Sequence, residues 1–124
     1  MTGGCERPDE DYTVRVAETA DTRVVVGYTC FGRAPFTEGT YDLYWIAVDP
    51  AHHGTGAARR LMAAAEAEIA GRGGRIVLVE TASKPSYART RAFYESIGYV
   101  EAARIRDYYG VGDDRITYEK RLGG

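Results

Sequence analysis

The chain has 124 residues, with 16 Lys or Arg, 18 Asp or Glu and a formal net charge of −2. This length is typical of one domain, and the balanced charge gives no electrostatic case for a nucleic-acid partner. No apolar run is as long as a membrane span, and the N-terminus lacks the basic and apolar regions of a signal peptide. We therefore expect a cytoplasmic protein with no membrane partner, in which Cys5 and Cys30 are free thiols.

The first 11 residues are polar, contain Gly and Pro, and are predicted to be a disordered tail. Residues 12–124 are predicted to form a single domain. Its elements are assigned from apolar periodicity and from Gly and Pro stops. In chain order we expect strands over 12–18, 23–31 and 40–48, a helix over 56–70, a strand over 75–80, a helix over 86–97, and strands over 99–106 and 115–122.

This order predicts a mixed α/β fold that starts with a hairpin and has one crossover through the first helix. The apolar face of that helix should carry Ala58, Leu61, Met62, Ala65 and Ile69. The nearly continuous apolar run over 75–80 is typical of a buried strand.

The most informative segment joins the third strand to the first helix. After the turn at Asp49-Pro50 it contains Gly54 and Gly56, and it enters a helix whose first N–H groups have no partner within the helix. Arg59 and Arg60 stand in the first turn, where the helix dipole disfavours cations, with no acid three or four residues later. A docked phosphate explains these features better than a glycine loop with solvated arginines.

Two other kinds of phosphate site fit less well. A mononucleotide P-loop requires Gly-Lys-Ser/Thr, which is absent. A dinucleotide-binding domain requires a third glycine where Arg59 stands, although Glu80 does close the next apolar strand.

Three blocks resemble the GNAT N-acetyltransferases. Residues 53–58, His-Gly-Thr-Gly-Ala-Ala, are similar to the acetyl-CoA motif Gln/Arg-x-x-Gly-x-Gly/Ala, with His53 at the usual Gln or Arg position. Residues 90–99 resemble the pattern Ala-x-x-x-Tyr-x-x-x-Gly-Phe, with Tyr87 where the family usually has Asn. Residues 104–122 resemble the last hairpin of enzymes that acetylate protein N-termini, such as the ribosomal-protein alanine acetyltransferases. Together the blocks extend from about Val24 to Leu122.

The resemblance implies a mixed, mostly antiparallel twisted sheet with two main helices, lacking the family's N-terminal strand and two helices. Those elements normally form one wall of the acceptor site. We therefore expect residues 12–18 to lie at a sheet edge, and a homodimer or a partner chain to complete the site.

The resemblance also implies an acetyl-CoA-dependent N-acetyltransferase that transfers acetyl directly to a primary amine of a small molecule or a peptide N-terminus. The alternatives are a non-catalytic acyl-CoA-binding or partner subunit and a dinucleotide-binding domain. No metal is expected, because adjacent His52 and His53 do not converge easily on one ion. The implied cofactor-binding residues are Ile46, Ala47, Val48, His53, Gly54, Thr55, Gly56, Ala57, Ala58 and Arg59.

Three residues are candidates for proton transfer. Tyr94 matches the family tyrosine that protonates the leaving thiolate, although its apolar neighbours also fit a core position. Glu80, at the end of a strand, is the candidate base; otherwise it is a structural acid paired with Arg89 or Arg91. Asp42 is the second candidate base, and its alternative is a solvated acid.

Aromatic residues are candidates for the acceptor pocket, where rings contribute area and tyrosine hydroxyls give orientation. Half-buried sheet positions explain several of them equally well. Tyr108 and Tyr109 are expected in a loop, which favours a functional role. The candidate substrate-binding residues are Tyr44, Tyr87, Tyr108 and Tyr109.

Overall fold

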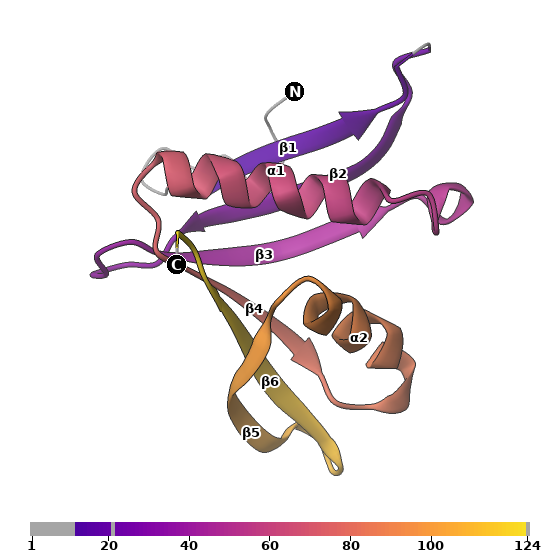
Figure 1. The fold of residues 1–124 in the computed structure, drawn as a ribbon. Helices are drawn as coiled ribbons and strands as arrows, with labels where there is room; N and C mark the ends of the chain where they lie inside the picture. The colour runs from indigo at the N-terminus through magenta and orange to yellow at the C-terminus, as the bar shows by residue number, and fades with distance from the viewer. Residues whose placement is uncertain (1–11, 21, 124) are drawn as a thin grey trace.

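The structure is a computed structural model that describes residues 12–20 and 22–123. The predicted N-terminal tail and Cys5 lie outside the described residues. The order of strands and helices is the predicted one, with two short 3-10 helices, η1 and η2, added (Figure 1). The elements are β1 (Tyr12–Glu18), β2 (Val25–Arg33), β3 (Thr40–Val48), η1 (Pro50–His52), α1 (Ala57–Gly71), β4 (Ile76–Ala82), η2 (Pro85–Tyr87), α2 (Ala88–Ser96), β5 (Val100–Gly110) and β6 (Asp113–Arg121).

In the described part of the chain, the strands form one sheet in the order β1-β2-β3-β4-β6-β5. All neighbours are antiparallel except β3 and β4, which are parallel and joined by the crossover through α1. The mixed, mostly antiparallel sheet is therefore confirmed. So is the edge position of β1, which pairs only with β2 among the described residues.

The parallel pair β3–β4 holds together over a short stretch and then opens. Residues 40–42 pair with residues 76–78, and no pairing is found beyond them although both strands continue. Figure 1 shows the two strands diverging, with β1 to β3 on one side of the split and β4 to β6 on the other. One side of β3 beyond Asp42 thus has no strand partner in the described residues.

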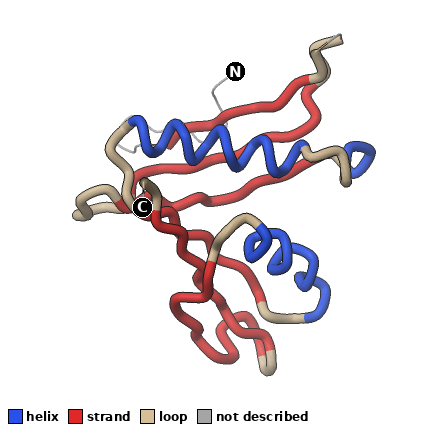
Figure 2. Tube along the Cα trace, viewed as in Figure 1, coloured by secondary structure: helices blue, strands red, loops and turns tan. Residues whose placement is uncertain are grey.

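Both helices pack on the same face of the sheet and share one apolar core (Figure 2). On α1, the predicted apolar face is right except that Ala57 is buried in place of Ala58, which is half-buried and lies beside a cavity. The core residues are Phe31, Tyr41, Leu43, Met62, Ala65, Ile69, Val77, Val79, Tyr94, Tyr99, Ile116 and Tyr118.

The prediction that Tyr108 and Tyr109 lie in a loop is wrong, because β5 continues to Gly110. The ladder is irregular there: no pair with β6 is formed between Ile105 and Gly110, and Asp107 has a φ of 58°. Carboxylates replace the missing ladder bonds. Asp107 accepts the Gly112 N–H at 2.8 Å, and the N–H of Asp107 itself donates to Asp114 at 3.1 Å.

The second predicted helix begins later than expected. Pro85 opens η2, and α2 starts only at Ala88. Among the described residues, no helix has the length and apolar character needed to cross a membrane.

Candidate active site

The loop between β3 and α1 is held open by its own side chains and glycines. Asp49 caps η1 by accepting the Ala51 N–H at 2.9 Å, and the Thr55 hydroxyl donates to the His52 carbonyl at 2.6 Å. Gly54 and Gly56 have φ values of 82° and 87°, which L side chains rarely adopt. Gly56 is the N-cap of α1, so the free N–H groups of the first helical turn follow it directly.

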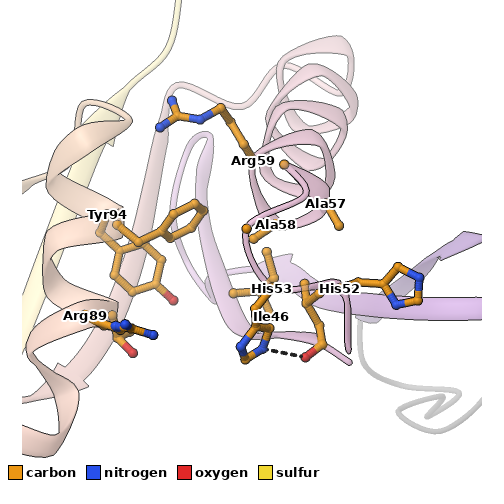
Figure 3. A pocket seen from close by; sticks show the side chains of 13 residues that line it. Ile46, His52, His53, Ala57, Ala58, Arg59, Arg89 and Tyr94 are labelled. Atoms are coloured by element: carbon orange, nitrogen blue, oxygen red, sulfur yellow. Dashed lines mark hydrogen bonds between the residues drawn. The ribbon is translucent and has the colours of Figure 1, made fainter. Parts of the chain in front are cut away.

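This loop forms one wall of a first cavity of about 560 Å³ (Figure 3). Cations enter it from two elements: Arg59 from α1 and Arg89 from α2. Neither has an ion pair among the described residues. Its lining residues are Ile46, Val48, His52, His53, Gly54, Gly56, Ala57, Ala58, Arg59, Arg89, Thr90, Phe93 and Tyr94.

Eight of the ten predicted cofactor-binding residues line this cavity, and Ala47 and Thr55 do not. Ala47 lies on the other face of the sheet beside its β2 partner Tyr28, because neighbouring strand residues alternate in direction. The Thr55 hydroxyl is turned back to the loop. The ring of His53 lies 3.0 Å from the Val48 carbonyl through Nε2, the bond drawn in Figure 3.

A second cavity, of about 520 Å³, occupies the split between β3 and β4. It shares Ile46, Thr90 and Tyr94 with the first cavity, so the two spaces meet at these side chains. It brings together residues from β3, β4, η2, α2, β5 and β6. Its lining residues are Tyr44, Trp45, Ile46, Glu80, Thr81, Ala82, Lys84, Tyr87, Thr90, Tyr94, Tyr109 and Asp113.

Three of the four tyrosines predicted for the acceptor pocket, Tyr44, Tyr87 and Tyr109, line this second cavity, and Tyr108 does not. The Tyr108 ring instead packs on the Arg115 guanidinium, 5.1 Å from its centroid. Asp113, which belongs to the hairpin block of residues 104–122, also lines the cavity. Thr81 lines it too and had no sequence signal, because only the meeting of distant strands places it there.

Tyr94 is 6% exposed and belongs to the core cluster, but its hydroxyl differs from those of its neighbours. The hydroxyls of Tyr99 and Tyr118 donate to Glu66 and Glu95 at 2.8 and 2.9 Å. No described residue hydrogen-bonds to the Tyr94 hydroxyl, which points toward Ile46 and His53 across the cleft in Figure 3. Burial raises the pKa of Tyr94, so the phenol keeps its proton at neutral pH.

Glu80 lines the second cavity and forms an ion pair with Arg115, whose Nε lies 2.5 Å from Oε2. The expected partners Arg89 and Arg91 are not used: Arg91 instead donates to the Ala82 and Lys84 carbonyls. A paired Glu80 is therefore found, but with a different arginine.

Asp42 is half-buried on β3 and lines neither cavity. Burial raises the pKa of Asp42, the nearby charge of Glu80 raises it further, and Arg115 opposes both effects. The two candidate bases are thus electrostatically coupled.

Comparison with known proteins decides the family. The family described as "Acetyltransferase (GNAT) domain" matches residues 10–101. This chain belongs to the GNAT family of acetyltransferases. No curated protein matches the chain.

Solved structures agree with this family. A protein assigned to the GNAT family from Desulfovibrio desulfuricans is 40% identical, with a TM-score of 0.86 over 91% of this chain and 71% of that one. An aminoglycoside 6'-N-acetyltransferase complexed with coenzyme A is 18% identical, with a TM-score of 0.80 over 94% and 76% of the two chains. The ribosomal-protein-S18-alanine N-acetyltransferase from Escherichia coli is 24% identical, with a TM-score of 0.76 over 93% and 72%.

The GNAT protein is thus an N-acetyltransferase, as predicted. The mostly antiparallel sheet does not fit the parallel, doubly wound sheet of a dinucleotide-binding domain. The first cavity fits coenzyme A in its chemistry, because it combines a helix start, backbone without Cβ atoms and unpaired cations. Among residues 12–20 and 22–123, no cluster of three or more His, Cys, Asp or Glu could hold a metal.

Proposed function

We propose that this GNAT protein transfers the acetyl group of acetyl-CoA directly to a primary amine, carried by a small molecule or a peptide N-terminus. The observation that carries the proposal is the junction of the two cavities at Ile46, Thr90 and Tyr94. A donor in the first cavity and an acceptor in the second would meet beside the free hydroxyl of Tyr94. Bringing two reactants together in this way is itself a large part of catalysis.

The first cavity is assigned to acetyl-CoA. The start of α1 and Arg59 would bind the pyrophosphate, and Arg89 would add a second positive charge from the opposite wall. The main chain of residues 46–48 would bind the pantetheine arm. This assignment is supported by the open side of β3 beyond Asp42, where no described strand uses the backbone groups.

Acetyl-CoA supplies the thioester whose carbonyl carbon the amine attacks. As the C–N bond forms, Glu80 accepts the proton that the amine nitrogen loses, and Asp42 is the alternative acceptor. The C–S bond breaks with its electron pair on sulfur, and the Tyr94 hydroxyl donates the proton that turns the thiolate into a thiol. Backbone N–H groups of the open strand would stabilise the developing oxyanion.

Direct transfer is supported by the position of the described cysteine. Cys30 has no exposed surface and lines neither cavity, so it is poorly placed to carry the acetyl group. Direct transfer predicts that both substrates must be bound together, and that no acetylated enzyme accumulates when acetyl-CoA is added alone.

The test is the release of free thiol from acetyl-CoA with a panel of diamines, amino sugars, amino-acid amides and short peptides. We expect turnover with at least one primary amine, and intersecting rather than parallel kinetic lines. If acetyl-CoA binds and no amine is acetylated, the protein is an acyl-CoA-binding subunit and the proposal fails. An acetylated protein detected by mass spectrometry would exclude direct transfer.

A homodimer, or a partner chain that completes the acceptor site, is proposed separately. The support is the half-exposed aromatic surface of Tyr44 and Trp45 on β3, where the Tyr44 ring packs against Tyr12 of the edge strand β1 with ring centroids 5.1 Å apart. Light scattering at micromolar concentration tests it. A monomer with full activity would contradict this proposal and leave the catalytic one intact.

A further inference from the structure

Thr81 has a buried hydroxyl without a hydrogen-bond partner. The residue follows Glu80 on β4, is 6% exposed and lines the second cavity. No described residue lies within hydrogen-bond distance and angle of its Oγ1. Buried polar groups are almost always satisfied, because an unmade hydrogen bond costs stability, so the exceptions need an explanation.

The hydroxyls of two other buried threonines do have hydrogen-bond partners. The Thr29 hydroxyl donates to the Trp45 carbonyl at 3.0 Å, and the Thr13 hydroxyl accepts from Arg72 at 3.0 Å. Neither residue lines either of the two cavities. The unpartnered threonine is the one at the acceptor cavity, where a ligand could supply the missing partner.

We propose that Thr81 is a positioning residue that orients the acceptor amine and selects primary over secondary amines. This inference rests on the proposed function. In the structure Oγ1 is shielded from the cavity. Rotation about χ1 of threonine exchanges the hydroxyl and the methyl group, so the hydroxyl can turn to a bound amine. A hydroxyl turned to the cavity accepts one N–H of the amine and leaves the nitrogen lone pair free to attack.

The proton count gives this arrangement its selectivity. A neutral primary amine has two N–H groups. One proton leaves for the carboxylate base at Glu80, whereas the other stays on nitrogen, becomes the amide N–H and keeps its bond to Thr81. A secondary amine has only the proton that leaves, so it cannot make the second bond. When a substrate lacks the N–H donor, the hydroxyl of the site is left without a hydrogen bond, and the enzyme discriminates strongly against that substrate.

The experiment compares Thr81→Val with Thr81→Ser, using the best primary amine of the panel and its N-methyl derivative. Valine has nearly the same shape without the hydroxyl, and serine keeps the hydroxyl. We expect Thr81→Val to lower kcat for the primary amine roughly 10- to 100-fold, the effect of one strong hydrogen bond. The kcat for the N-methyl amine should fall much less. Thr81→Ser should keep most of the preference for the primary over the secondary amine. Acetyl-CoA affinity by calorimetry should not change.

Thr13→Val is the matched control, because it removes a buried hydroxyl that has a partner outside the site. We expect Thr13→Val to lower Tm and leave the amine preference intact. Thr81→Val should leave Tm equal or higher, since it removes an unsatisfied group.

A Thr81→Val enzyme with wild-type kcat and amine preference overturns this inference. So does a lower Tm with no change in preference, which would mean a purely structural hydroxyl. Absence of turnover in the wild type would instead overturn the proposed function.

Discussion

The two cavities that meet at Tyr94 are built in different ways. The first takes most of its lining from one continuous segment, residues 46–59, with α2 closing the other side. The second takes its lining from β3, β4, η2, α2, β5 and β6, which are far apart in the sequence. The first is lined by two arginines that have no ion pair among the described residues, whereas the second is lined mainly by aromatic rings, together with the carboxylates of Glu80 and Asp113 and the ammonium group of Lys84.

This difference agrees with the physical demands of the two proposed binding tasks. A phosphate group can be held by main-chain N–H groups and a helix start, which a short local motif provides. The proposed acceptor site instead uses side chains from several strands, which meet where the sheet opens between β3 and β4. Substitutions in the first cavity should therefore weaken acetyl-CoA binding, whereas substitutions in the second should lower turnover.

The largest effect is expected at the junction itself. Tyr94→Phe keeps the ring in the core and removes the proton donor, so turnover should fall roughly 10²- to 10⁴-fold with acetyl-CoA affinity intact. Tyr118→Phe is the control, because it removes a hydroxyl bound to Glu95 in the same cluster. That control should lose stability and keep its turnover. Wild-type turnover in Tyr94→Phe would assign Tyr94 to the core alone.

A smaller loss of turnover is expected on the acceptor side from Glu80→Gln, about 10²-fold, because a general base is removed while the shape of the side chain is kept. The loss should be greatest near neutral pH, measured as a pH–rate profile. Glutamine also breaks the ion pair with Arg115, so the melting temperature must be followed alongside. An unaltered pH–rate profile would move the assignment to Asp42 or to water.

On the cofactor side, two adjacent arginines give a matched pair. Arg59 lines the first cavity, whereas Arg60 does not and instead reaches the Thr55 carbonyl at 3.4 Å. Arg59→Ala should weaken acetyl-CoA binding about 10-fold, the scale of one charge-assisted hydrogen bond, and flatten its salt dependence. Arg60→Ala should change binding much less. If calorimetry shows that both variants lose the same acetyl-CoA affinity, the general positive charge of this region, and not the position of Arg59 in the cavity, binds the phosphates.

The smallest effect concerns Asp42, close to Glu80 and Arg115. Its pKa is raised in the folded protein above the ordinary value of 3.8, so the native state holds this proton more tightly than the unfolded chain. Wild-type stability should therefore fall relative to Asp42→Asn as pH rises from about that ordinary value through the raised one. Urea unfolding of both proteins across this range measures the difference. Parallel stability curves would show that Asp42 is not coupled to folding.

The edge position of β1 was expected from the resemblance to the GNAT family. Apolar periodicity and glycine stops were sufficient to predict the order of strands and helices and the crossover through α1. These features are local, because each depends on neighbouring residues in one segment. The end of β5 was not predicted, because it depends on hydrogen bonds between residues that are not neighbours in the periodic pattern. Asp107 and Asp114 replace the ladder bonds there with side-chain bonds, and no period along the chain reveals that substitution.

By itself the sequence was sufficient to predict the family, which the comparisons confirm, and to propose a phosphate loop, since the two glycines, the helix start and the arginines lie within a few residues of one another. The roles assigned to Tyr94, Glu80 and Asp42 stay predictions. Only the tertiary structure decided that Arg115 pairs with Glu80, that Tyr108 does not line the second cavity and that Thr81 lies without a partner beside that cavity. The physical reason is that these relations depend on cross-strand register and on the split between β3 and β4, which bring together residues far apart in the chain.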